Sequence, residues 1–192
     1  MKKLFVICLC IIFLFIGWDK NNKNNDNKSK KPDTKIEKTV KKVEPKKFPD
    51  MLEKNLINGK GKDIPFKNIA TKKYFLFYFS AHWCPPCRKF TPKFVEWYNK
   101  KASKNFEVIF VSSDKNKKKM LEYMTKTKMP WLAIKHESPI RKLIQKKFGG
   151  TGIPCLALIS KQGKRVVHSF ENGKYTIPVK ILEKISKLLS GM

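Results

Sequence analysis

The chain has 192 residues, of which 41% are hydrophobic and 30% are charged, and its formal net charge is +28. A chain of this length has room for one ordinary domain and additional segments, and its apolar content excludes a wholly disordered protein. The charge alone would suit a polyanion, but only three of the 43 basic residues are arginine. A bias toward lysine and asparagine often reflects an AT-rich genome rather than a ligand, so we expect no nucleic acid partner.

The amino end has the pattern of a targeting segment. Lys2 and Lys3 precede an apolar run at residues 4–16, like the charged and hydrophobic regions of a signal peptide. No small-residue cleavage site follows, and the run is shorter than the ~20 residues usually needed to span a bilayer. We expect residues 1–18 to be a signal peptide or an uncleaved signal-anchor. The protein is then exported to the cell envelope and attached to the membrane, with its domain on the periplasmic or extracytoplasmic side.

A tether is predicted to follow this segment. Residues 19–47 are rich in lysine and asparagine and hold hardly an apolar side chain. Such a composition cannot bury enough surface to offset the entropy that is lost on ordering. We therefore expect a disordered tether at 19–47 and a folded domain at 48–192.

Strands and helices alternate along the predicted domain. Apolar residues at nearly every position predict a strand buried on both faces at 74–81. Two prolines, which suit a first helical turn, then open a helix with aromatic residues at helical spacing to about residue 101. The other predicted elements are strands near 56–58 and at 106–113, 155–160 and 165–170, and helices at 116–126, 139–148 and 177–189. This order predicts an α/β fold, in which helices cover both faces of a sheet.

The stretch FSAHWCPPCRKF places Cys84 and Cys87 where the first long strand meets the first helix. A structural zinc site needs four Cys or His ligands, and no second pair with ligand spacing is present, so we expect no metal. A c-type haem attachment would need His in place of Arg88. A plain structural disulfide stays open, but the junction of a strand and a helix suits chemistry better than a staple.

Redox chemistry fits the cysteine pair best. A cysteine at a helix N-terminus meets unpaired backbone N–H groups and the positive end of the helix dipole, both of which favour the thiolate. This predicts Cys84 as the nucleophile, and Cys87, one helical turn on, as the resolving thiol that attacks the mixed disulfide. Trp83 can pack over an exposed sulfur of Cys84 and offer an apolar surface to substrate. Pro85 and Pro86 restrict the loop between the cysteines and tune the relative stability of dithiol and disulfide.

Four segments together resemble the thioredoxin superfamily, specifically its tryparedoxin/nucleoredoxin branch and exported bacterial relatives. They are WCPPCR, VSSD, MPWLAI and GIPCLALI, and the resemblance covers about residues 48–192. It implies a thioredoxin-like three-layer fold, a central mixed sheet with helices on both faces. It also implies that Ile153 and Pro154 form the cis-proline loop, which faces the active-site disulfide and offers backbone groups to an extended substrate peptide.

Two positions depart from thioredoxins proper. Thioredoxins carry a buried Asp six positions before the first cysteine, and this chain has Tyr78 there, as in the tryparedoxin-like branch. The residue after the expected cis-proline is Cys155, where Thr is common. We expect a buried, inert thiol at Cys155, with a third redox thiol as the alternative.

Three further side chains near the motif have open roles. His82 either forms a hydrogen bond near the thiolate or is a half-exposed histidine at a strand end, and no partner is predicted for the other two histidines. Trp131 is expected in the core beneath the rim of the site, with contact to substrate as the alternative. Arg88 either favours the thiolate and acidic partners or lies on a solvated face.

The sequence thus predicts a thiol-disulfide oxidoreductase that reduces protein disulfides through Cys84 and Cys87 without a further cofactor. Its expected partners are disulfide-bearing proteins, an unidentified electron donor and the membrane. The alternatives are a disulfide-forming or isomerising enzyme of the same fold, and a non-catalytic basic binding or metal-delivery module.

Overall fold

The structure, a computed structural model, describes residues 48–101 and 105–191. The predicted signal segment and tether, residues 1–47, lie outside the described residues. Among the helices of the described residues, none combines the length and the apolar character needed to cross a membrane.

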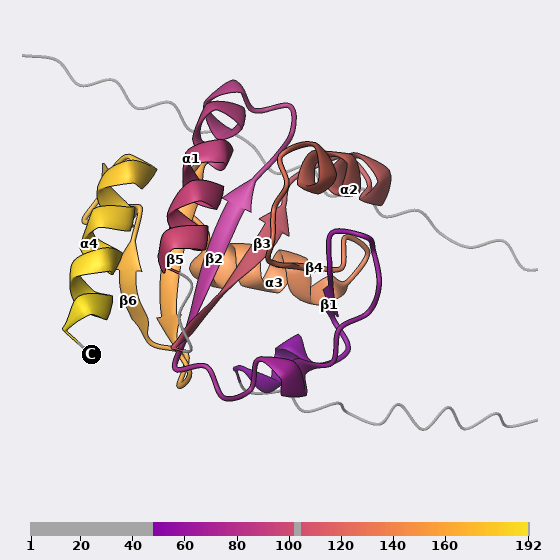
Figure 1. Ribbon diagram of the computed structural model, residues 1–192, viewed down its shortest axis with the longest axis horizontal. Coiled ribbons are helices and arrows are strands. Elements are labelled where there is room, and N and C mark those ends of the chain that lie inside the picture. Colours follow the sequence, from indigo (N-terminus) through magenta and orange to yellow (C-terminus); the bar gives the residue numbers. More distant parts are fainter. Residues whose placement is uncertain (1–47, 102–104, 192) are drawn as a thin grey trace, which may run out of the picture. The chain divides into compact units, whose positions relative to one another are not determined.

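A six-stranded mixed sheet forms the centre of the fold, with strand order β1-β4-β3-β2-β5-β6 (Figure 1). Strands β2, β3 and β4 run parallel, whereas β1 pairs antiparallel to β4, and β5 and β6 form an antiparallel pair beside β2. The strands are β1 (Leu56–Ile57), β2 (Tyr74–Ser80), β3 (Phe106–Ser112), β4 (Leu132–Ile134), β5 (Cys155–Ser160) and β6 (Arg165–His168).

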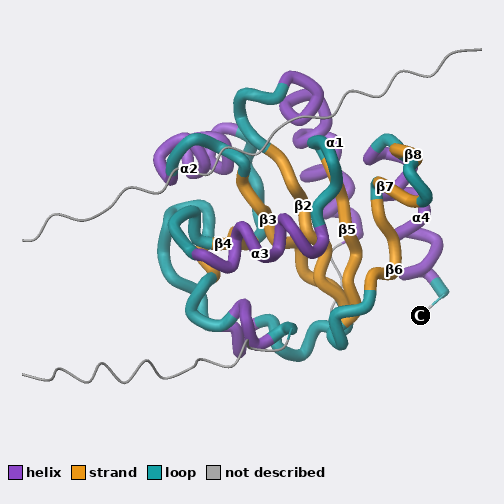
Figure 2. Tube along the Cα trace, turned by 180° about the vertical axis from the view of Figure 1, so that it is seen from behind, coloured by secondary structure: helices purple, strands orange, loops and turns teal. Residues whose placement is uncertain are grey.

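Four α-helices cover the two faces of this sheet. Figure 1 shows α1 and α4 in front of the strands, and the view from behind in Figure 2 shows α3 across the other face. The helices are α1 (Pro85–Lys101), α2 (Lys117–Lys126), α3 (Pro139–Phe148) and α4 (Pro178–Ser190). Two short 3-10 helices, η1 (Asp50–Leu52) and η2 (Phe66–Asn68), precede β2. The predicted three-layer arrangement is confirmed.

Residues of β2 alternate between two hydrophobic cores, because successive side chains of a strand point to opposite faces. Leu76 and Tyr78 belong to the core under α1, α2 and α4, which also holds Phe94 and Trp131. Phe75, Phe77 and Phe79 belong to the core under α3. All of these β2 side chains are buried, as the continuous apolar run predicts.

Local capping signals fix where the helices begin. The side chain of Asn116 accepts a hydrogen bond from the backbone N–H of Lys119 at the start of α2, and Ser138 caps α3 in the same way. Proline opens α1, α3 and α4, where its missing N–H costs no helical hydrogen bond.

The predicted strand at 165–170 is split in the structure. It ends as β6 at His168, and a separate hairpin follows, made of β7 (Phe170–Glu171) and β8 (Lys174–Tyr175). Asn172 and Gly173 form its turn with φ of 51° and 74°, the left-handed conformation that two-residue hairpin turns require and that Asn-Gly adopts readily. The other predicted helices and strands are present to within a few residues.

Candidate active site

Cys84 and Cys87 lie where β2 delivers the chain into α1. They are joined by a disulfide across the first turn of α1, with the two Cα atoms 5.2 Å apart. The backbone N–H of Cys87 donates to the sulfur of Cys84 at 3.2 Å. This N–H is one of the first in the helix, which have no partner within the helix itself, and the predicted placement at a helix N-terminus is confirmed.

The sulfurs are less exposed than the sequence suggests. Cys84 is 3% exposed and Cys87 is fully buried, so the expectation of an exposed nucleophilic sulfur is wrong for this disulfide form. The sulfur of Cys84 lies 3.7 Å from the carbonyl oxygen of Ile153, and the loop from β5 thus covers it on one side.

The predicted cis-proline is present. The peptide bond between Ile153 and Pro154 is cis, and a second cis peptide bond precedes Pro49. Because the carbonyl of Ile153 lies against the sulfur of Cys84, this loop faces the disulfide as the sequence resemblance implies.

Trp83 is held at the rim of the site. Its side chain is among the exposed large hydrophobic groups of the described residues, at 54% exposure, while its indole N–H donates to the backbone oxygen of Ser113 at 3.1 Å. The hydrogen bond anchors one edge of the ring, and the rest of the ring presents apolar surface to solvent.

A network of buried hydroxyl groups lies behind Cys87. Thr91 is at its centre, because its hydroxyl donates to the backbone oxygen of Cys87 at 2.8 Å and lies 2.7 Å from the hydroxyl of Tyr78 and 2.5 Å from that of Tyr123. Ser80 contacts the Tyr123 hydroxyl at 3.2 Å. Burial raises the pKa of Tyr78 well above its usual value, so this phenol stays neutral and cannot accept a proton as a carboxylate would.

His82 has a partner that the sequence did not reveal. Its Nδ1 lies 2.6 Å from Oδ1 of Asp114, whose side chain is fully buried. The same carboxylate accepts the backbone N–H of His82 at 2.8 Å and the hydroxyl of Ser112, and Arg88 donates to the backbone oxygen of His82 at 2.7 Å. These bonds fix the chain just before Trp83. The only signal for Asp114 was its place in the VSSD segment.

The other two histidines also have partners. His136 lies with Nε2 2.8 Å from the backbone oxygen of Asp114. His168 is buried and contacts the backbone oxygens of Phe148 and Phe170 through its two ring nitrogens. Both histidines therefore connect segments that are distant in the sequence. Within residues 48–101 and 105–191, no group of three or more His, Cys, Asp or Glu side chains is arranged to hold a metal ion.

Cys155 is buried, as predicted, and its side chain belongs to the core on the α3 face of the sheet. Burial raises the pKa of its thiol to about 11, so the thiol form prevails at neutral pH. Trp131 is likewise a core residue, 1% exposed and packed against Phe94 with ring centroids 4.6 Å apart.

An apolar pocket of about 330 Å³ lies beside the disulfide, lined by Pro86, the cis-proline loop and two aromatic residues of the β7–β8 hairpin. These are Phe170 and Tyr175, whose ring centroids are 4.9 Å apart. The hydroxyl of Tyr175 donates to the backbone oxygen of Pro154 at 3.0 Å, so the hairpin is tied to the loop. Sequence reasoning missed both aromatic residues, although the Asn-Gly turn between them was a readable signal.

Comparisons with known proteins point to one family. A family model described as thioredoxin-like matches residues 72–165. The chain is 42% identical to tryparedoxin of Trypanosoma brucei brucei over 109 residues, which are 55% of this chain and 72% of that protein. It is 42% identical to probable nucleoredoxin 1 of Arabidopsis thaliana over 114 residues, 58% of this chain. The match spans only 19% of that nucleoredoxin's length.

Among solved structures, a thioredoxin from Wuchereria bancrofti superposes with a TM-score of 0.58 at 28% sequence identity. This superposition covers 74% of the chain and 98% of that thioredoxin. The sheet order and the helices described above therefore match an experimentally determined fold.

Proposed function

Because the chain belongs to the thioredoxin-like family that includes the tryparedoxins and nucleoredoxins, we propose that it is a thiol-disulfide oxidoreductase. It acts through Cys84 and Cys87 and reduces disulfides of proteins. The thiol-disulfide redox activity of the family supports the reaction class. The direction of the reaction and the residues that perform it are inferred from this chain.

One observation carries the proposal, the disulfide across the first turn of α1 against the cis-proline loop. The backbone N–H of Cys87 points at the sulfur of Cys84, and the same N–H would stabilise a Cys84 thiolate after reduction. The loop carbonyl of Ile153 at 3.7 Å marks where the backbone of a bound peptide would run. A structural staple needs neither feature.

The exchange begins from the reduced pair. The Cys84 thiolate attacks one sulfur of the substrate disulfide, a bond forms between Cys84 and that sulfur, and the other substrate sulfur leaves as a thiolate. Cys87 then attacks the sulfur of Cys84, which restores the disulfide between the two cysteines. The departing substrate thiolate takes up the proton that Cys87 loses. Two electrons have passed to the substrate, and a dithiol donor must return them before the next cycle.

Substrate recognition follows from the surroundings of Cys84. The exposed ring of Trp83 and the apolar pocket at the cis-proline loop suit an extended peptide with apolar side chains near its cysteine. Trp83 directly precedes Cys84, and the pocket is lined by Pro86 between the two cysteines and by the cis-proline loop.

The place of action is proposed from the sequence. The signal-like residues 1–18 and the lysine-rich residues 19–47 favour an exported domain that stays attached to the membrane, on the periplasmic or extracytoplasmic side. The electron donor is then a membrane or envelope dithiol.

Trapping tests the roles of the two cysteines. A Cys87→Ser variant is expected to accumulate a mixed disulfide between Cys84 and a substrate such as insulin, which mass spectrometry of the non-reduced protein detects. The matched Cys84→Ser variant should form none. Mixed disulfides through Cys87 in the Cys84→Ser variant would overturn the assignment.

The reduction potential tests the direction. Titration of the full chain in defined glutathione buffers should give a value near the −270 mV of thioredoxin, which suits a reductase. A potential near −120 mV would instead identify a disulfide-forming enzyme.

A further inference from the structure

A second hollow, of about 700 Å³, is lined in part by His82 and Arg88, which flank the two cysteines in the chain, and it differs in character from the apolar pocket. We call it the basic groove, and its polar lining includes Arg88, Lys119, Glu122, Tyr123, Lys126 and Lys128. The two hollows share no lining residue. In Figure 2, α1 lies between α2, which lines the groove, and the β7–β8 hairpin, which lines the apolar pocket.

The charge of the basic groove is strongly positive. Four of its side chains are cationic and only one, Glu122, is a carboxylate. Glu122 pairs with Lys119 at 2.9 Å, and that interaction lowers the pKa of the carboxyl, which therefore stays ionised. Within the described part of the chain, Lys126 and Lys128 have no ion-pair partner. The groove thus has a net positive charge that the described residues do not neutralise.

Two of the groove's residues connect it to the active site. Arg88 directly follows Cys87 on α1. Its guanidinium donates to the backbone oxygen of His82, so this side chain connects the residues on the two sides of the cysteine pair. Tyr123, at the other side of the groove, contacts Thr91, which in turn donates to the backbone oxygen of Cys87. A chain segment in the groove would therefore lie against residues that contact the active site.

Lys128 occupies a position where lysine is costly. Its φ of 52° lies in the left-handed region that glycine and asparagine adopt most readily after a helix, and that other L residues adopt at a cost. The side chain is exposed and lines the groove. Lys128 therefore places a positive charge in the groove just after the end of α2.

We propose that the basic groove binds an acidic segment of the disulfide-bearing protein that the chain reduces. This inference rests on the proposed function and names the class of its substrate. Charge complementarity identifies the occupant, because carboxylates that flank the substrate cysteine can pair with Arg88, Lys126 and Lys128. The apolar pocket at the cis-proline loop carries no charged side chain. Because only the basic groove attracts carboxylates, the charge would also set the orientation of the bound segment.

Peptide substrates test the proposal in the full chain. Each peptide carries one cysteine, joined to thiopyridine as a mixed disulfide and flanked by glutamates, glutamines or lysines. The second-order rate constant for reduction by the dithiol form is measured at low ionic strength. The expected order is glutamate, glutamine, lysine, with about a tenfold span, because several exposed ion pairs act together. Salt should compress this span.

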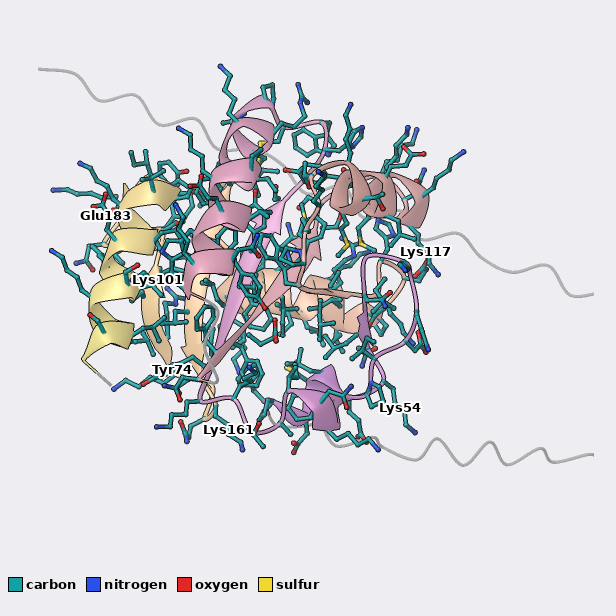
Figure 3. The ribbon with its side chains drawn as sticks, viewed as in Figure 1. Lys54, Tyr74, Lys101, Lys117, Lys161 and Glu183 are labelled. Atoms are coloured by element: carbon teal, nitrogen blue, oxygen red, sulfur yellow. A yellow bond between two sulfur atoms is a disulfide. The ribbon has the colours of Figure 1, made fainter. Side chains whose placement is uncertain are left out.

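Two charge-reversal variants locate the effect. Lys126→Glu/Lys128→Glu should lose most of the preference for the glutamate peptide, although neither residue contacts the cysteines. Lys161→Glu/Lys164→Glu makes the same change in net charge at the end of the sheet remote from α2, where Figure 3 labels Lys161, and should keep the preference. Circular dichroism verifies that both variants fold.

The outcomes separate the two proposals. If the wild-type chain reduces all three peptides at one rate, or if both double variants lose the preference equally, the basic groove is not the recognition site. If no peptide reacts, or if Cys84→Ser reacts as fast as the wild type, the proposed function itself fails. Inhibition by an oligonucleotide as strong as by a cysteine-free glutamate peptide would mark a general polyanion site and overturn the acidic-protein assignment.

Discussion

Replacing Thr91 by valine should destabilise the protein more than any surface substitution of the same size. Valine keeps the shape of the side chain but removes a hydroxyl that is fully buried and makes three contacts, at 2.8, 2.7 and 2.5 Å. Tyr123 retains its contact with Ser80 at 3.2 Å, whereas the hydroxyl of Tyr78 loses its 2.7 Å partner.

The magnitude follows from these contacts. A buried hydroxyl left without its partner costs about 1–3 kcal/mol, and each neutral hydrogen bond contributes about 1 kcal/mol net. We expect Thr91→Val to lower the free energy of unfolding by about 2–3 kcal/mol. Tyr78→Phe should cost only about 1 kcal/mol, because Thr91 keeps its contacts with Cys87 and Tyr123.

A double-mutant cycle measures the coupling free energy between Tyr78 and Thr91. Once Tyr78 has lost its hydroxyl, Thr91→Val leaves no orphan there, so the double variant should be about 1 kcal/mol more stable than the sum of the single effects predicts. Urea unfolding of the oxidised protein measures each free energy, with an unchanged slope as the sign that only stability has changed.

The control for this cycle is Thr125→Val, an exposed threonine on α2, which should stay within about 0.5 kcal/mol of the wild type. A Thr91→Val effect equally small, or strictly additive single effects, would refute the hydroxyl network as a source of stability.

Three further predictions concern single sites. Cys155, with a thiol pKa of about 11, should be alkylated at pH 8 about 100-fold more slowly in the folded protein than in urea, as peptide mass spectrometry can measure. Because the pKa of this thiol is higher in the folded than in the unfolded protein, the stabilisation that Cys155 contributes should fall as the pH rises from 9 toward 11. Gly150→Ala would place Cβ 2.1 Å from the ring of Phe170 and should lower the free energy of unfolding by about 1–3 kcal/mol; an unchanged urea midpoint would contradict this packing. The buried indole N–H of Trp131 has no hydrogen-bond partner among the described residues, so Trp131→Phe should cost less than about 1.5 kcal/mol in urea unfolding, and Trp131→Ala about 3–5; equal losses for the two variants would argue against this.

Much of the fold could be predicted because local signals and the global arrangement agree. The apolar run that became β2, the prolines at the start of α1 and the alternation of strands and helices each have one physical reading. The position of the cysteine pair at the helix start could be predicted from the same prolines, whereas the cis bond before Pro154 was predicted from the family resemblance and agrees with the low cost of cis X–Pro bonds.

The parts that were missed depend on contacts between distant residues. His82 and Asp114 are 32 positions apart, and the hydroxyls of Tyr78 and Tyr123 meet at Thr91. The local sequence around these residues does not predict which residue each contacts. Such contacts depend on strand register and on the crossover connections between strands. The low exposure of Cys84 has the same origin, since the segment that covers it comes from the loop before β5.

The borders of the described sheet limit how other chains can attach. At one border β1 has only two residues, and at the other β6 has four and a register shift interrupts its pairing with β5. Short or irregular borders offer few unpaired backbone groups, and proteins use them to resist edge-to-edge aggregation. These borders therefore offer few backbone groups to which another polypeptide could pair as an added strand. In the proposed reductase, selection among substrate proteins would then depend on the surface around Cys84, where a few substitutions could change it without altering the sheet.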